Sequence, residues 1–310
     1  MRGWRKVNIV RGIGLLALSG ILLWGCTGAV GGPSPTASPP PTATWTPWPP
    51  SPTPVPVAAE VNGERITVEE VQAEMARLQA AAAQLGMNLA PEEAWQRALD
   101  DLIDQVLLAQ AAVEQGFDLE AAVQQGLTEA QAAYPSTEAF LAYLASLGFD
   151  EAGYRAWLGR ATAAAWMRDR IAAQVPTQAE QVHAQQILIY NEQEARQVWQ
   201  ALQSGADFDQ WAAVYDPQNR GDLGWFPRGV LSEPALEAAA FQLDVGAISP
   251  VIVTPWGYHI LRVLERQSAR PLSTPARQIL QQRTLAQWLQ ARRAQSEIRL
   301  GPSPYPTSAP

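Results

Sequence analysis

Apolar residues recur at helical spacing through the first half of the chain. Residues 67–86 open with a Thr-x-x-Glu capping pair, continue with apolar residues three and four positions apart, and stop at Gly86. Residues 91–116 follow the same spacing after a proline and two glutamates, which favour a helix start. Three further stretches of this kind cover 119–133, 137–147 and 151–174. We interpret these stripes as the packing faces of a helical region, because no catalytic pattern lies within them.

Shorter alternating patterns flank this region. Residues 58–67 predict a strand pair around the turn Asn62-Gly63. After residue 180 strands and helices alternate: strand 184–190, helices 192–204 and 207–214, a turn into a strand at 221–226, helix 237–243, and strands 251–254 and 258–264. This order predicts a compact α+β domain of about 90 residues. Residues 272–300 are helical in composition and carry apolar residues on two sides, which favours a helix held between other elements.

The N-terminus has the pattern of an export signal. Four basic residues lie between positions 2 and 11, and a short apolar run from Gly12 to Trp24 follows them. The run ends in Leu23-Trp24-Gly25-Cys26, which resembles the lipobox of bacterial lipoproteins. The resemblance implies a signal peptide over 1–25, lipidation of Cys26, and a location on the extracytoplasmic face of the cell membrane. The alternative is an ordinary signal peptide followed by an accidental cysteine.

Two segments lack the composition needed to build a core. Residues 33–56 contain 11 prolines among Ser, Thr and Ala, so we predict a solvated tether over 26–57. Extended at ~3.1 Å per residue, the proline-rich segment 33–56 would reach roughly 75 Å. Residues 301–310 predict a second, disordered tail.

Composition excludes several classes of function. One Cys among 310 residues excludes an internal disulfide framework and a cysteine-cluster metal site, and we expect no metal and no cofactor. The net charge is −8, and removal of the four basic residues of the leader leaves 18 basic against 30 acidic residues, or −12. An acidic chain does not suit nucleic acid, so we expect no nucleic-acid partner. The sequence also lacks a Ser-His-Asp set, a P-loop and a dinucleotide fingerprint.

Three segments in order resemble the N-terminal region of exported folding factors of the SurA and PrsA kind: VNGERIT, LDDLIDQVLLAQAAVEQGF and EAFLAYLASLGFDEAGYRAWL. The resemblance implies a mostly helical chaperone domain over 58–179. It also implies that a C-terminal helix, 269–300, returns to pack on that domain. A separate domain over 180–268 would then be inserted between the two parts.

The inserted segment resembles the parvulin family of peptidyl-prolyl isomerases. The resemblance is carried by SGADFDQWA, GDLGWF and RGVLSEPALEAAAFQLDVGAISPVIVTPWGYHIL. It implies an α+β fold in which a four-stranded sheet and its helices form a shallow proline pocket. Carried over position by position, the family's catalytic positions fall on His259, Asp216 and Gln186. Its substrate-binding positions fall on Leu223, Phe226, Leu231, Leu236, Thr254 and Trp256.

The chain departs from the family pattern at one of these positions. The family has a histidine where this chain has Gln186, and the nearby His183 is offset by three residues. An odd offset along a strand places His183 on the opposite face, so it cannot replace the missing histidine.

The prediction is a membrane-anchored, extracytoplasmic prolyl isomerase that assists the folding of exported proteins. Its partners would be unfolded or partly folded exported polypeptides containing X-Pro segments. Because a glutamine side chain cannot take up and release a proton as a histidine can, we expect weak isomerase activity. The alternative is a non-catalytic holdase chaperone whose parvulin-like domain is a degenerate peptide-binding module. A passive envelope scaffold is a third possibility, which only the tether favours.

Overall fold

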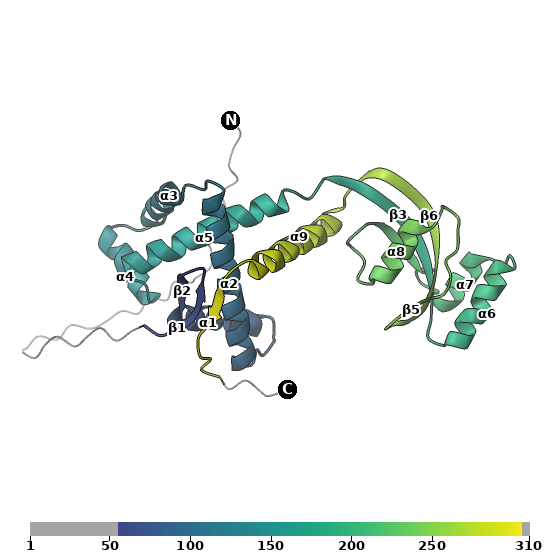
Figure 1. Cartoon of the computed structure of the whole chain (residues 1–310), viewed down its shortest axis with the longest axis horizontal. Coiled ribbons are helices and arrows are strands. Elements are labelled where there is room, and N and C mark those ends of the chain that lie inside the picture. Colours follow the sequence, from purple (N-terminus) through teal and green to yellow (C-terminus); the bar gives the residue numbers. More distant parts are fainter. Residues whose placement is uncertain (1–54, 306–310) are drawn as a thin grey trace, which may run out of the picture. The chain divides into compact units, whose positions relative to one another are not determined.

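The computed structural model describes residues 55–305. The predicted signal peptide, Cys26 and the tether up to residue 54 therefore lie outside the described residues, as do residues 306–310. The described chain forms a helical region and a separate α+β region, and both are shown in Figure 1. No helix within residues 55–305 combines the length and the apolar character needed to cross a bilayer.

The helical region is built around α2 and α5. Its elements are β1 (Val57–Val61), β2 (Glu64–Thr67), α1 (Val68–Gln84), α2 (Pro91–Glu114), α3 (Leu119–Gln131), α4 (Thr137–Ser146), α5 (Glu151–Ala172), α9 (Thr274–Ala294) and β7 (Ile298–Leu300). The capping box at Thr67 and Glu70 starts α1, and Pro91 starts α2, as predicted. One side of α2 buries Leu99, Leu102 and Val106 against the strands and α1, while its C-terminal half packs on α5. The apolar stripes are therefore packing faces.

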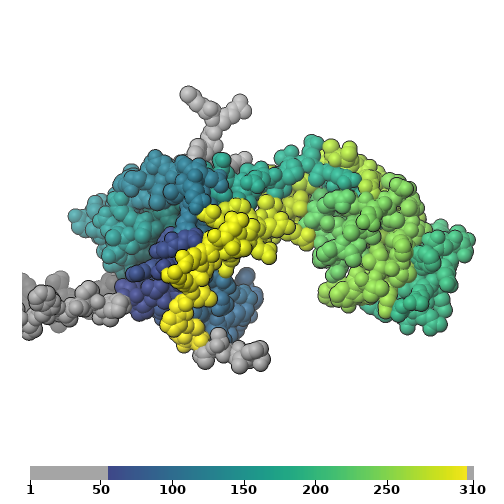
Figure 2. Space-filling model, viewed as in Figure 1, coloured from purple at the N-terminus to yellow at the C-terminus, as the bar shows by residue number. Residues whose placement is uncertain are grey.

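The C-terminal helix returns to this region. Leu285, Trp288 and Leu289 of α9 pack against the core formed by α2 and α5. A sheet of order β2-β1-β7 then closes the region, with β1 antiparallel to both neighbours. Figure 2 shows the C-terminal segment lying against the N-terminal strands.

The end of the chain differs from the prediction. The helix stops at Ala294, and residues 298–300 form a strand instead of continuing the helix to residue 300. The first part of the predicted tail is also ordered: the Gly301 amide donates to the Ala58 carbonyl over 2.8 Å, and the Tyr305 ring lies 5.9 Å from that of Trp95. Pairing with β1 explains the strand and the place of Gly301, while packing on α2 explains the place of Tyr305.

The second region is an α+β domain with one four-stranded sheet. Its elements are β3 (Gln178–Ile189), α6 (Glu192–Gln203), α7 (Phe208–Tyr215), β4 (Asp222–Pro227), α8 (Pro234–Gln242), β5 (Ile252–Thr254) and β6 (Gly257–Pro271). The strand order is β4-β3-β6-β5, and every pair is antiparallel. Ile187, Ile189 and Ile260 pack with α6 and α7, whereas Val182 and Leu261 pack with α8. Alternation along β3 and β6 therefore separates two cores, one on each face of the sheet.

The α+β domain is inserted through adjacent points of the chain. Strands β3 and β6 extend beyond the predicted strands and pair along their lengths, from Gln178 with Pro271 to Ile189 with Tyr258. Just outside this ribbon, the Leu272 amide donates to the Thr177 carbonyl over 2.9 Å. The chain thus leaves the helical region and returns to it at neighbouring positions.

Candidate functional site

A cleft of about 300 Å³ opens on the face of the α+β domain that carries α8. Ten residues from the sheet, α8 and the loops line it: Gln186, Leu188, Tyr190, Leu223, Leu231, Ser232, Glu233, Leu236, Trp256 and His259. Seven of the nine positions that sequence predicted as catalytic or substrate-binding lie in this cleft or contact a residue in it, namely Gln186, Leu223, Leu231, Leu236, Thr254, Trp256 and His259.

Three leucines from different elements form the apolar wall. Leu223 comes from β4, Leu231 from the following loop, and Leu236 from the first turn of α8. The Glu237 carboxylate fixes the loop that carries Leu231. One of its oxygens accepts backbone N–H groups from Gly229, Val230 and Leu231 at 2.8, 3.1 and 3.3 Å.

A chain of hydrogen bonds forms the polar floor. His259 is only 3% exposed. Its Nδ1 lies 2.9 Å from Oε1 of Gln186, and its Nε2 lies 2.9 Å from Oγ1 of Thr254. Since the Gln186 oxygen can only accept, Nδ1 carries the proton and Nε2 accepts from the Thr254 hydroxyl. The Trp256 amide in turn donates to Oγ1 of Thr254 over 3.1 Å.

Burial keeps this histidine neutral. Removal from water lowers the pKa of His259, and the nearby Glu233 carboxylate opposes this effect in part. Gln186 is well matched to a neutral imidazole because its oxygen accepts the Nδ1 proton without becoming charged itself. The Gln186 oxygen therefore completes the hydrogen-bond network around His259.

A hydrogen bond between two side chains closes the rim of the cleft. The Trp256 indole, 66% exposed, lies in the turn between β5 and β6. Its Nε1 donates over 2.8 Å to Oε1 of Glu233, the residue that precedes α8. The rim is thus part aromatic and part carboxylate.

Asp216 does not belong to the cleft, which corrects its predicted place beside His259 in the polar floor. Its two carboxylate oxygens accept the backbone N–H groups of Asn219 and Gly221, each over 3.0 Å. These hydrogen bonds hold the pKa of Asp216 below its usual range. Asp216 shapes the loop before β4. The Gly221 carbonyl of that loop accepts a hydrogen bond from the backbone N–H of Gln186 over 2.8 Å.

Phe226 also lies elsewhere than predicted. It is 2% exposed and packs edge-to-face against Phe241 of α8, so it belongs to the core beneath the cleft. His183 lies outside the cleft, as its offset predicted: its Nε2 lies 2.8 Å from Oδ1 of Asp222, and its ring stacks on Trp225.

Four lining residues were missed by sequence reasoning. Leu188 and Tyr190 share the strand parity of Gln186, so the alternation could have identified them once Gln186 was placed. Ser232 and Glu233 follow Leu231 directly, but only the return of α8 brings them to the rim.

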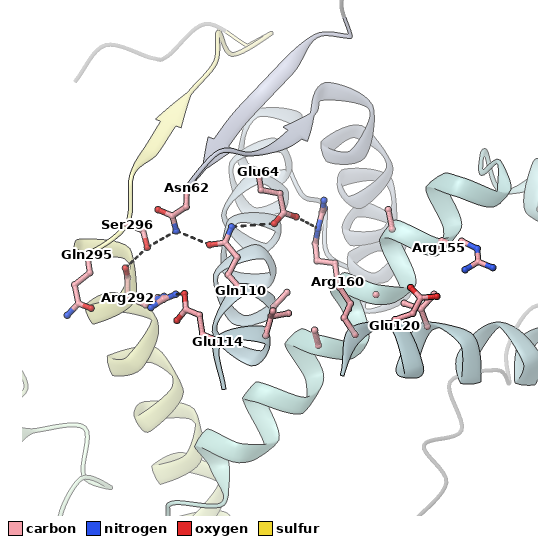
Figure 3. Close-up of a pocket in the computed structure, with 17 residues that line it drawn as sticks. Asn62, Glu64, Gln110, Glu114, Glu120, Arg155, Arg160, Arg292, Gln295 and Ser296 are labelled. Carbon is pink, nitrogen blue, oxygen red and sulfur yellow. Dashed lines mark hydrogen bonds and ion pairs between the residues drawn. The ribbon is translucent and has the colours of Figure 1, made fainter. Parts of the chain in front are cut away.

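The helical region contains a second, larger cavity of about 900 Å³, shown in Figure 3. Its apolar lining includes Ala109, Val113, Leu119, Val123 and Ala163. Five of its six charged side chains form ion pairs: Arg160 binds Glu64, Arg292 binds Glu114, and Arg155 binds Glu151 outside the lining. The sixth, Glu120, accepts a hydrogen bond from the neutral side chain of Gln124. Between these pairs, Gln110 accepts from Asn62 and donates to the Val61 carbonyl. The cavity contains no arrangement of nucleophile and base.

Within residues 55–305, no group of three or more His, Cys, Asp or Glu side chains is placed to hold a metal ion.

Comparison with protein families agrees with this division of the chain. A model described as the SurA-like N-terminal domain matches residues 4–168, which is more than half of the sequence. The chain belongs to the SurA-like family. A second model, described as the PPIC-type PPIASE domain, matches residues 175–275 and covers the whole four-stranded sheet. The SurA-like chain thus carries a parvulin-type isomerase domain.

Relatives of the SurA-like chain are folding factors. It is 36% identical over 97 residues to the foldase protein PrsA of Geobacillus sp. (strain WCH70), which covers 30% of this chain and 35% of that protein. It is 39% identical over 105 residues to the chaperone SurA of Methylobacillus flagellatus, covering 30% and 24% respectively. The match thus spans about a third or less of these relatives. A crystal structure of PrsA from Bacillus anthracis matches 64% of this chain and 96% of that one, with 23% identity and a TM-score of 0.42.

Proposed function

We propose that this protein is a peptidyl-prolyl cis-trans isomerase that assists the folding of exported polypeptides. The observation that carries the proposal is the cleft itself, in which Leu223, Leu231 and Leu236 stand over the neutral chain Gln186–His259–Thr254. An apolar wall of this kind fits a proline ring, and the floor beneath it presents fixed hydrogen bonds rather than a reactive group.

The reaction needs no covalent step. Rotation about an X-Pro bond is opposed by amide resonance, with a barrier of roughly 18–20 kcal/mol. A cleft that binds the twisted amide more tightly than either planar form lowers this barrier. The leucines hold the ring, while the cleft removes the X-Pro amide from water, which weakens its resonance stabilisation. Both nitrogens of His259 are already engaged, so the imidazole serves as a rigid support and not as a base.

The test compares two truncations of matched kind in the protein without its leader. Leu231→Ala removes a wall of the cleft, whereas Val245→Ala truncates an exposed side chain in the same domain, outside the cleft lining. We expect Leu231→Ala to lower kcat/KM on a proline peptide by about tenfold or more. Val245→Ala should retain the parent value. Absence of catalysis in the parent protein would remove the proposal.

A second function, holding unfolded clients, is favoured by the cavity of the helical region. That cavity places apolar side chains such as Val113 and Leu119 among polar ones, most of its charges are paired within the protein, and it has no catalytic set. Such a surface suits uncharged segments of an unfolded chain. The two functions are compatible, because they involve separate regions.

We further propose that lipid on Cys26 holds the protein on the extracytoplasmic face of the membrane. The support is the sequence Leu23-Trp24-Gly25-Cys26 after a basic and then apolar leader, together with the absence of any other cysteine in the chain. Cys26→Ala should leave the protein unprocessed or release it from the membrane fraction. A processed Cys26→Ala protein that remains in the detergent-extractable fraction would contradict the anchor.

A further inference from the structure

The cleft contains one formally charged side chain that isomerisation itself does not require. Besides its two aromatic residues, the lining has four polar residues, of which Gln186 and His259 are hydrogen-bonded to each other and Ser232 is neutral. The fourth is Glu233. None of the ion pairs among residues 55–305 involves its carboxylate, which accepts a hydrogen bond from the neutral indole of Trp256. This charge therefore faces whatever enters the cleft.

We propose that Glu233 and Trp256 make the isomerase select prolines that have a basic neighbour, Arg or Lys, over prolines that have an acidic one. The inference rests on the proposed isomerase function and adds a substrate class to it.

The dimensions of the cleft place the neighbouring side chain at the rim. A cavity of about 300 Å³ has room for a proline ring and part of one neighbouring residue. Adjacent Cα atoms are only ~3.8 Å apart, so the residue beside the proline has to leave the cleft close to its lining. The side chains of Glu233 and Trp256 are hydrogen-bonded to each other at that rim.

Both rim groups favour a cation. The carboxylate attracts it directly, and the indole offers a π face, the best aromatic surface for Arg or Lys. The Glu233 charge acts within the cleft, since it raises the pKa of His259 against the effect of burial. Two arginines lie near the loop between β4 and α8, and neither is part of the lining. Arg283 donates to the Leu231 carbonyl over 3.1 Å, and Arg228 lies over the Phe241 ring.

The test uses three peptides that differ only beside the proline, with Arg, Gln or Glu, in one set before the proline and in another after it. Isomerisation is measured by exchange NMR on the protein without its leader. In at least one set, we expect kcat/KM for Arg to exceed that for Glu by about three- to tenfold at low salt, and the ratio to fall in 0.5 M salt, where charges are screened.

Two variants separate the local charge from the overall one. Glu233→Gln keeps an oxygen that can accept from Trp256 and removes only the charge, so it should reduce the Arg-to-Glu ratio to twofold or less. Asp244→Asn makes the same change at an exposed residue outside the cleft lining and should keep the parent ratio.

The outcomes are distinct. Equal rates for the three peptides in both sets would overturn the inference and leave the isomerase intact. If the preference for Arg survives Glu233→Gln, or if Asp244→Asn removes it, the net charge of the protein causes the preference. Either result would also overturn the inference. If no peptide is isomerised, the proposed function fails, and peptide binding followed by chemical shifts decides whether the charge selection holds alone.

Discussion

The hydrogen bond between Gln186 and His259 has consequences that single substitutions can measure. Gln186→Ala leaves the Nδ1 proton of a 3% exposed imidazole without a partner, which costs about 1–3 kcal/mol of stability. Gln186→His can restore a partner, because a second neutral imidazole accepts a proton as the amide oxygen does. We therefore expect Gln186→His to leave kcat/KM unchanged or to raise it. Gln186→Ala should lower kcat/KM less than Leu231→Ala, because in the proposed function the leucine holds the proline ring and the glutamine supports His259. The reverse order would make the floor, not the wall, the main source of catalysis.

The lowered pKa of His259 predicts a specific dependence of stability on pH. The unfolded chain takes up the histidine proton near pH 6.5, whereas the folded chain resists it. Stability is therefore lost as pH falls from about 6.5 towards the lower folded pKa, and the effect is absent above pH 7. Thermal unfolding measured from pH 7.5 to 5.5 should show a smaller loss in His259→Gln than in the parent. An equal loss in both proteins would mean that other groups cause it.

At this scale the sequence located the wall and the floor but not the exceptions. Leu223, Leu231 and His259 lie within distinctive motifs, and the fold brings all three into one cleft. Asp216 was misplaced because its role depends on the path of the loop, which turns two amides onto its oxygens. The importance of Glu233 could not be predicted, because its partner Trp256 is 23 residues away and only the fold brings them together.

Among the elements, the loop before α8 offers the sharpest test of how the cleft is shaped. Glu237 holds three successive amides of the loop that carries Leu231. Glu237→Ala removes the acceptor that holds this loop in place. Each hydrogen bond to a charged group contributes about 1.5–3 kcal/mol to stability. We expect KM to rise and kcat/KM to fall about tenfold, measured on one proline peptide.

Glu237→Gln provides the graded comparison, because its oxygen still accepts but carries no charge. Its kcat/KM should lie between those of the parent and Glu237→Ala. Asp244→Ala, at an exposed residue outside the lining, serves as the control and should match the parent. If Glu237→Ala matches the parent as well, the loop holds its position without the carboxylate.

The elements themselves were largely predictable, and the errors have a physical pattern. Helices with capping residues and apolar stripes, such as 67–86 and 91–116, were placed within about three residues, because their signals are local. The strand β7 was missed because three residues form it, and they are stabilised by pairing with β1, more than 230 positions earlier in the chain. The ribbon β3–β6 was underestimated because its outer halves are only partly buried and lack a continuous apolar pattern.

For the molecule as a whole, the adjacency of Thr177 and Leu272 predicts that the two regions can be separated. Because these residues share a hydrogen bond, a short Gly-Ser-Gly linker can replace residues 178–271. The packing of α9 on α2 and α5 and the pairing of β7 with β1 remain in such a protein. We expect it to fold cooperatively and to suppress the aggregation of a denatured client, with no isomerase activity.

The matched control for this experiment removes residues 272–310 as well. It lacks α9 and β7, so we expect the helical region to lose its cooperative unfolding transition. If the linker protein folds but no longer suppresses aggregation, the clients are held by the isomerase domain, and the cavity of the helical region has another role.

The central position of β1 also determines how the protein responds to mechanical load. A pull that enters the described chain at Val55 acts along β1, whose hydrogen bonds to β2 and β7 run across the strand. Such a pull shears both ladders at once, so they share the force. A pull from the other end of the chain first meets the contacts of Tyr305 and Gly301 and then strains β7, which has a single ladder. The folded protein is therefore best suited to bear tension through its N-terminal side, which is the side on which we propose the membrane anchor.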